Sequence, residues 1–217
     1  GIETVLNAQG EEELFSKKFT AEIEKVKLPH TKFQLLVKSL KKAIREYGKT
    51  NQLKAQRFDE RLQKVIDEYN TRDKLVFANE VASKTVQAIQ EVVNKKLNEL
   101  TGEVLDLFRR LRKDREEFKR LGITFEEKAF YDILVDQREA HGFEYPDEKC
   151  LALSRKIKAL IDNSAVYADW LNNDNLKADL QAELTILLYQ EGYPPEWDEE
   201  VFNKVMEQVR NFKTYNS

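Results

Sequence analysis

Residues able to do nucleophilic, acid–base or metal chemistry are few in this sequence. His30 and His141 are its only histidines and Cys150 is its only cysteine. Neither histidine has a cysteine or a second histidine at the spacing of zinc ligands, so we expect no metal site. Cys150 lies nine positions after His141, a pair that could act as nucleophile and base. A lone cysteine that enters a helix is more often a small buried hydrophobe, and we expect no catalytic residue here.

The string Gly48-Lys49-Thr50 is similar to the end of a phosphate-binding loop, in which backbone amides and a lysine hold phosphates. A complete loop needs a glycine five residues before Gly48, where this chain has Ala43 inside a helical pattern. The sequence therefore predicts that Gly48 ends a helix, and it predicts no cofactor-binding residue.

Pro146-Asp147 followed by Lys149 is similar to a fragment of a restriction-type nuclease site, where carboxylates hold Mg²⁺. Such a site also needs strands and a second carboxylate pair. We expect Asp147 to act instead as the N-cap of a helix, and we predict no magnesium site.

Charge is distributed unevenly along the chain. Residues 17–54 hold eleven lysines and arginines against three glutamates, whereas residues 174–217 hold four basic against nine acidic residues. A basic stripe can meet DNA phosphates and release counterions, and it can equally be a solvated helix face. The candidate DNA contacts are Lys38, Lys41, Lys42, Arg45, Arg109, Arg110 and Arg112.

Composition and periodicity together predict an all-α protein. Charged residues make up 35% of the 217 residues, and only seven glycines and four prolines are available for turns. Apolar residues recur every three or four positions, which predicts a multi-helix bundle of about eight or nine amphipathic helices. We expect basic linker and entry helices in residues 1–50 and a helical assembly domain in residues 51–217.

Several helix boundaries can be predicted from local signals. Thr124 and Glu127 form the pattern of a capping box, and Asn173 or Asp174 and then Asp198 are candidate caps of later helices. Two further helices are expected in residues 72–100 and 104–121, separated at Gly102 because glycine disfavours helix interiors.

Large aromatic residues near helix ends are candidates for contact with another protein. They can also plug the ends of a helical bundle, and this alternative is the commoner one. Tyr189 is one of the aromatic residues near helix ends to which both alternatives apply. The candidate protein contacts are Phe130, Tyr131, Trp170, Tyr193, Pro194 and Trp197.

The single cysteine allows no intramolecular disulfide, which indicates a reducing compartment. The sequence has no run of about 18 apolar residues and no apolar leader, so we expect a cytoplasmic protein without a membrane span.

Four blocks of the sequence are more distinctive than the helical periodicity. They are Arg57–Leu62 with Tyr69, Asn70 and Arg72; Leu121–Thr124 continuing through Ala129–Asp132; Asp169-Trp170; and Gly192–Pro195. In order and approximate spacing these blocks resemble the C-terminal domain of the restriction subunit of type I restriction-modification enzymes. The resemblance implies a parent chain with nuclease and helicase-like motor domains, which uses ATP and Mg²⁺ to translocate and cleave DNA. None of those motifs lies in this chain.

The same resemblance implies a docking role. In this family the C-terminal helical region is thought to dock onto the modification methyltransferase, which acts with the specificity subunit. Relatives carry several basic residues on the helix after the Asp-Trp pair, whereas this chain has an uncharged run at residues 186–190. That difference disfavours nucleic-acid binding by this helix.

Three functional hypotheses follow. The preferred one is a non-catalytic module that assembles the restriction complex through protein contacts and reaches DNA through that complex. The alternative is a nonspecific DNA-binding or DNA-guiding module that uses the basic stripe of residues 17–54. The third is an enzyme that works through Cys150 or a carboxylate pair.

Overall fold

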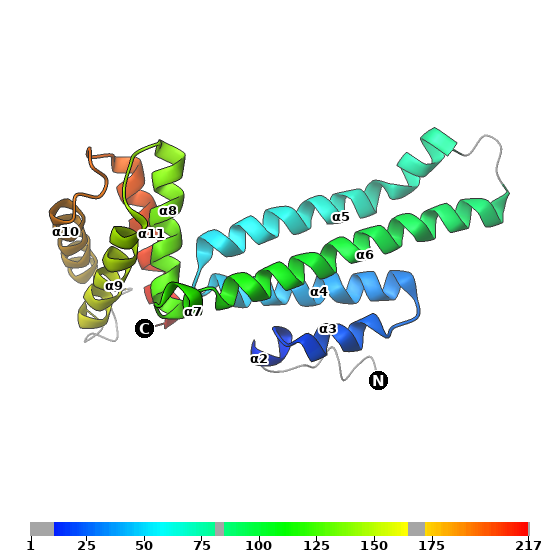
Figure 1. Ribbon diagram of the computed structural model, residues 1–217, viewed down its shortest axis with the longest axis horizontal. Helices are drawn as coiled ribbons and strands as arrows, with labels where there is room; N and C mark the ends of the chain where they lie inside the picture. Colours follow the sequence, from blue (N-terminus) through cyan, green and yellow to red (C-terminus); the bar gives the residue numbers. More distant parts are fainter. Residues whose placement is uncertain (1–10, 81–84, 165–171, 217) are drawn as a thin grey trace. The chain divides into compact units, whose positions relative to one another are not determined.

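The computed structural model describes residues 11–80, 85–164 and 172–216, with the side chains of residues 11, 12 and 73–80 left undescribed. All regular elements within these ranges are α-helices, which confirms the predicted all-α class (Figure 1). They are α2 (Glu11–Leu14), α3 (Lys17–Glu24), α4 (Pro29–Gly48), α5 (Gln52–Glu80), α6 (Val86–Glu116), α7 (Phe118–Leu121), α8 (Phe125–His141), α9 (Asp147–Ser164), α10 (Asp174–Gln190) and α11 (Glu199–Asn216).

The chain folds into two compact units. Unit 1 comprises Gly1–Glu46 and Gln56–Asp114, and unit 2 comprises Tyr47–Ala55 and Arg115–Ser217. These boundaries differ from the division at residue 50 expected from the sequence. The reason is that the turn between α4 and α5 packs within unit 2, whereas the helices before it share a core with α5 and α6.

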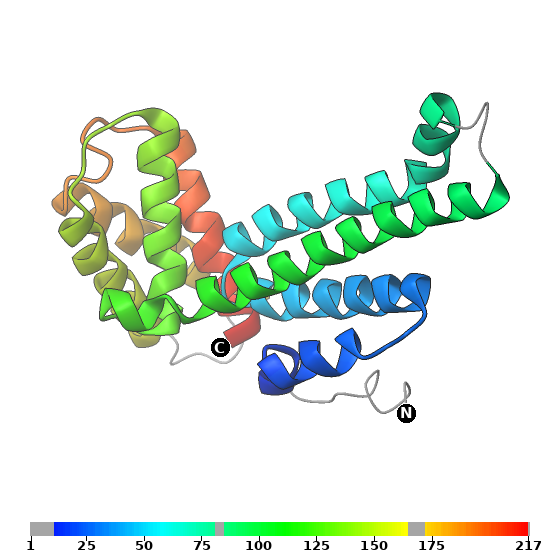
Figure 2. The ribbon, with the colours of Figure 1, turned by 45° about the vertical axis from the view of Figure 1, so that its right-hand side comes forward.

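In unit 1, α4, α5 and α6 lie side by side, with α5 and α6 antiparallel, as both ribbon views show (Figures 1 and 2). The ring of Phe33 on α4 stacks on Tyr69 of α5 with centroids 4.2 Å apart, and Phe19 of α3 meets Phe108 of α6. The buried side chains recur every three or four residues, as predicted. They include Phe33, Leu36, Leu40, Phe58, Leu62, Leu97, Leu100, Val104, Phe108 and Leu111.

Helix α6 runs unbroken through Gly102, so the predicted separation of two helices at that residue is wrong. Leu100 and Val104 on either side of Gly102 are fully buried. Their burial outweighs the cost of one helical glycine, which is about 1 kcal/mol. The segment 72–80 likewise belongs to α5 rather than to the following helix.

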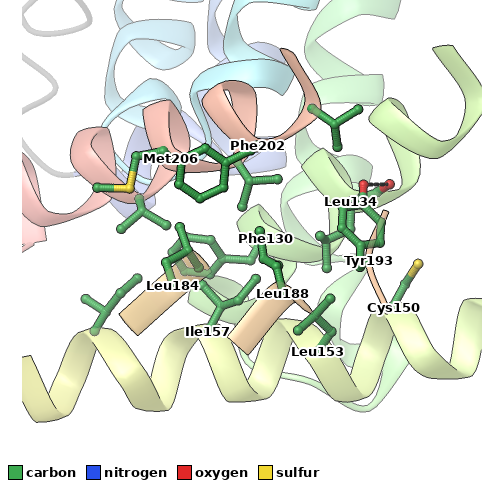
Figure 3. Packing of buried hydrophobic residues seen from close by; sticks show 14 of the residues in the cluster. Phe130, Leu134, Cys150, Leu153, Ile157, Leu184, Leu188, Tyr193, Phe202 and Met206 are labelled. Carbon is green, nitrogen blue, oxygen red and sulfur yellow. Dashed lines mark hydrogen bonds between the residues drawn. The ribbon is translucent and has the colours of Figure 1, made fainter. Parts of the chain in front are cut away.

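Unit 2 is built around α8, which packs on α9 and α11, while α10 packs on α9 and α11. The core residues come from all four helices and from the loop after α10 (Figure 3). Tyr193 of that loop is fully buried, and its hydroxyl donates to the carbonyl oxygen of Leu134 at 2.7 Å. Cys150 and Phe130 lie in the same cluster.

Local capping signals explain where the helices of unit 2 begin. The Thr124 hydroxyl accepts from the Glu127 amide, and the Glu127 carboxylate accepts from the Thr124 amide, which confirms the predicted capping box. Asn173 caps α10, and the Asp198 carboxylate accepts from the first amides of α11.

The N-cap role expected for Asp147 is wrong, because Asp147 is the first residue inside α9. There its carboxylate accepts a hydrogen bond from Arg138 at 2.5 Å. An acidic residue in the first turn also interacts favourably with the helix dipole.

Candidate functional site

Cys150 and His141 have separate structural roles. The Cys150 side chain is fully buried in the core of unit 2, and burial raises the pKa of its thiol to about 11. A cysteine nucleophile acts as the thiolate, which this environment disfavours. His141 instead places Nδ1 3.2 Å from the Asp198 carboxylate.

The string Gly48-Lys49-Thr50 forms the turn after α4 rather than a phosphate cradle. The amide of Thr50 donates to the carbonyl oxygen of Tyr47 at 3.1 Å. The carbonyl oxygens of Gly48 and Lys49 accept from the side chains of Asn211 and Asn216 on α11. The expected helix end at Gly48 is confirmed.

The other titratable candidates also have protein partners. His30 Nδ1 lies 3.1 Å from the Tyr69 hydroxyl. Among the residues that the structure describes, no three His, Cys, Asp or Glu side chains are grouped so as to hold a metal ion.

The basic candidates separate into two groups. Lys38, Lys41 and Arg45 on α4 are exposed and form no ion pair with the described residues. Lys42 is exposed on the same face. These four positions, three or four residues apart, share one side of the helix.

The three candidate arginines on α6 already have protein partners. Arg110 pairs with Asp106 at 2.7 Å, and Arg109 lies 4.0 Å from Glu24. The guanidinium of Arg112 is half-buried and donates to the carbonyl oxygens of Phe15 and Ser16. Arg112 therefore anchors the turn before α3, which the sequence pattern did not indicate.

The structure places the aromatic candidates mostly in the interior of unit 2. Phe130 and Tyr193 are fully buried, Pro194 is buried, and Tyr131 is half-buried. Trp197 is 53% exposed and lies against the ring of Phe202. Trp170 lies outside the described residues.

A surface that we did not predict lies on the outer face of α10, defined by Ala178, Ala182, Ile186 and Tyr189. All four are exposed, Ile186 by 56% and Tyr189 by 81%. Their spacing places them on the side of α10 opposite the buried Leu180, Leu184 and Leu188. Helix α10 thus exposes apolar side chains on its outer face as well, where Asp179, three residues before Ala182, is a charged neighbour.

Two features of the sequence could have indicated this exposed surface of α10. The uncharged run 186–190 supplies the large residues, and the alanines at 178 and 182 extend the same face by one turn each. An amphipathic helix is expected to have a single apolar face, so a second face made largely of small residues gives no clear signal in the apolar periodicity.

A shallow groove of about 590 Å³ lies between α5 and α6 in unit 1. Val65 and Leu107 form part of its lining beside Gly102, and charged residues of both helices complete it. It is open to solvent and lacks a cysteine, serine or histidine.

Comparison with known proteins gives the class to which this helical chain belongs. Residues 3–215 match the family described as "Type I restriction enzyme HindI endonuclease subunit-like, C-terminal". The chain therefore belongs to this family of C-terminal domains of type I restriction endonuclease subunits, which confirms the resemblance seen in the sequence.

A curated relative from Methanocaldococcus jannaschii, described as a type I restriction enzyme MjaIXP endonuclease subunit, is 29% identical over 197 residues. The match covers 90% of this chain and 16% of that relative's length. No solved structure matches the chain. None of the helices that the structure describes is long and apolar enough to cross a membrane.

Proposed function

We propose that this chain is the assembly domain of a cytoplasmic type I restriction endonuclease subunit, and that it docks through the outer face of α10. The partners are the modification methyltransferase and specificity subunits. The domain is non-catalytic, and it reaches DNA through the complex. Nuclease and motor chemistry, with ATP and Mg²⁺, belongs to other parts of the parent protein.

The observation that carries this proposal is the row of exposed apolar side chains on the outer face of α10, which has Asp179 as a charged neighbour. Ala178 and Tyr189 are eleven residues apart, so the face extends over about 16 Å of helix. Small alanines allow close approach of a partner helix, and Ile186 and Tyr189 provide large side chains to bury. Exposed apolar surface of this kind is typical of protein interfaces.

The electrostatics of this segment favour a protein partner over DNA. Residues 174–217 carry nine acidic against four basic residues, so they repel phosphate. The outer face itself has no cation to neutralise a phosphate group. Family membership then supports the other subunits of the restriction complex as the partner.

A paired substitution tests the proposal in the complete restriction subunit. A182E/I186E places two carboxylates within the outer face of α10. Q181E/N203E is the matched control, because it adds the same charge at exposed positions of α10 and α11 outside that face. Assembly with the methyltransferase–specificity core is measured by light scattering.

We expect A182E/I186E to weaken assembly by about 100-fold or more, since unpaired buried charges cost several kcal/mol and each 1.4 kcal/mol is tenfold. The control should assemble like the wild type, and both variants should keep the wild-type helical circular dichroism. Wild-type assembly by A182E/I186E, or equal loss in both variants, would refute the docking surface.

A further inference from the structure

The exposed side of α4 is unusually uniform in charge. Between residues 34 and 45 its exposed positions are Gln34, Lys38, Lys41, Lys42 and Arg45. Four of the five are cations and none is an acid. The single acidic residue of α4, Glu46, is half-buried. We call Lys38, Lys41, Lys42 and Arg45 the α4 basic face.

This face differs from charged surfaces in which cations alternate with acids. Arg110 on α6 pairs with Asp106, and Lys158 on α9 pairs with Asp162. The whole chain carries a formal charge of -3, so its bulk charge repels polyanions. A local row of cations in an acidic chain therefore needs an explanation beyond general solubility.

The core of unit 1 fixes the row in place. Leu36, Leu40 and Ile44 are buried on the opposite side of α4, which sets the direction of the exposed side chains. From Lys38 to Arg45 the helix rises about 10 Å, which is close to the axial rise of about three base pairs of duplex DNA. The lysine and arginine side chains are long enough to follow a phosphate strand over that length.

The residue types of the α4 basic face favour duplex DNA over an acidic protein or a single-stranded nucleic acid as its partner. It has no exposed apolar side chain that could anchor a protein partner, and alanine scanning finds such anchors at the centre of protein interfaces. It also has no aromatic residue on which unpaired bases could stack. A surface that has lysines and arginines but no exposed apolar or aromatic side chains is typical of sequence-independent contact with the phosphates of duplex DNA.

We propose that the α4 basic face binds the phosphate backbone of duplex DNA without reading its sequence. This inference concerns unit 1, and it does not depend on the protein-docking role proposed for α10. Each can fail while the other holds.

The test measures binding of the 217-residue chain to a fluorescent duplex of about 20 base pairs by anisotropy, at 50 and 200 mM salt. The variant K38Q/K41Q/R45Q removes three cations from the face. Glutamine has nearly the helix propensity of lysine and arginine, so α4 should be retained, and circular dichroism checks this.

The matched control is K149Q/K204Q/R210Q, which removes two lysines and one arginine from exposed positions of unit 2. It changes the net charge by the same amount. A loss of binding that follows total charge alone would appear equally in both variants.

For three phosphate contacts, from Lys38, Lys41 and Arg45, the wild-type affinity should fall about 40-fold between 50 and 200 mM salt, because the slope of log affinity against log salt is about -0.9 per contact. K38Q/K41Q/R45Q should bind at least tenfold more weakly at 50 mM and lose most of the salt dependence, while the control keeps the wild-type slope.

Four results would overturn the proposal. They are no wild-type binding at 50 mM salt, equal weakening in the control variant, tighter binding to a single strand of the same length, and competition by polyglutamate as effective as that by duplex. The last result would assign the face to an acidic protein surface.

Discussion

Lys128 donates a hydrogen bond to Asp132 at 2.5 Å inside unit 2, where the two side chains are only 1% and 8% exposed. Asn51 donates to the same carboxylate at 2.8 Å, and Lys128 also donates to the Tyr47 hydroxyl at 3.3 Å. The pair therefore fastens the turn between α4 and α5 to α8. Taking two charges out of water is costly, so each of them depends on the other.

Lys128→Met should lower the free energy of unfolding by about 3–5 kcal/mol, because it leaves the Asp132 carboxylate buried without its cation. The double variant K128M/D132L should lose much less than the sum of the two single variants, since it removes both charges. Urea unfolding followed by circular dichroism measures all three. Additive losses would show that the pair is not coupled.

Gly102→Ala should raise the free energy of unfolding by about 0.5–1 kcal/mol, because alanine restricts the unfolded chain and favours the helix. A Cβ added at Gly102 meets no atom within 4 Å, so no clash opposes the gain. Gly122→Ala is the contrasting variant and should destabilise, since Gly122 has a φ of 69°. A Gly102→Ala protein less stable than the wild type would contradict the structure of α6.

Thr124→Ala should cost about 1 kcal/mol of unfolding free energy through loss of the capping box. Thr124→Ser keeps the hydroxyl that accepts from Glu127, and it should remain within about 0.5 kcal/mol of the wild type. The urea midpoint of each variant provides the comparison. Equal stability of the alanine and serine variants would mean that the cap contributes nothing.

Alkaline pH should destabilise the protein through Cys150. Burial raises the pKa of this thiol from its usual 9.0 to about 11. Above pH 9 the unfolded chain therefore loses this proton while the folded chain keeps it, so the free energy of unfolding falls as pH rises toward 11. Tyr145 acts in the same direction, because burial raises its pKa to about 12.

Cys150→Ala isolates the contribution of the thiol. This variant should be less stable than the wild type at pH 7 because it leaves a small cavity. Its stability should decline less steeply between pH 9 and 10.5, as measured by urea unfolding at each pH. The same decline in both proteins would rule out Cys150 as a source of the pH dependence.

The sequence was sufficient to predict those features of the fold that depend on interactions between neighbouring residues. The all-α class follows from apolar periodicity, and the starts of α8, α10 and α11 follow from the side chains of Thr124, Asn173 and Asp198. The side chain of each of these residues accepts a hydrogen bond from a backbone amide at most three positions later. The start of each helix can therefore be predicted without knowing the contacts of distant residues.

Contacts between distant segments could not be predicted in this way. Lys128 and Asp132 have the spacing of an ordinary surface pair on a helix, and only the packing of residues 47–55 makes them a buried pair. Arg112 is similar to its neighbours in sequence, yet residues almost a hundred positions earlier accept its hydrogen bonds. Gly102 continues a helix because residues on either side of it are buried by other elements.

The most direct test of the docking role is photo-crosslinking from the outer face of α10. A benzophenone amino acid replaces Tyr189 in the complete restriction subunit, and in a control it replaces Gln181, which is exposed on another side of the same helix. After irradiation with the methyltransferase–specificity core, we expect a covalent product with a core subunit from position 189 and little from position 181. An assembled complex that gives no product from position 189 would contradict the docking role.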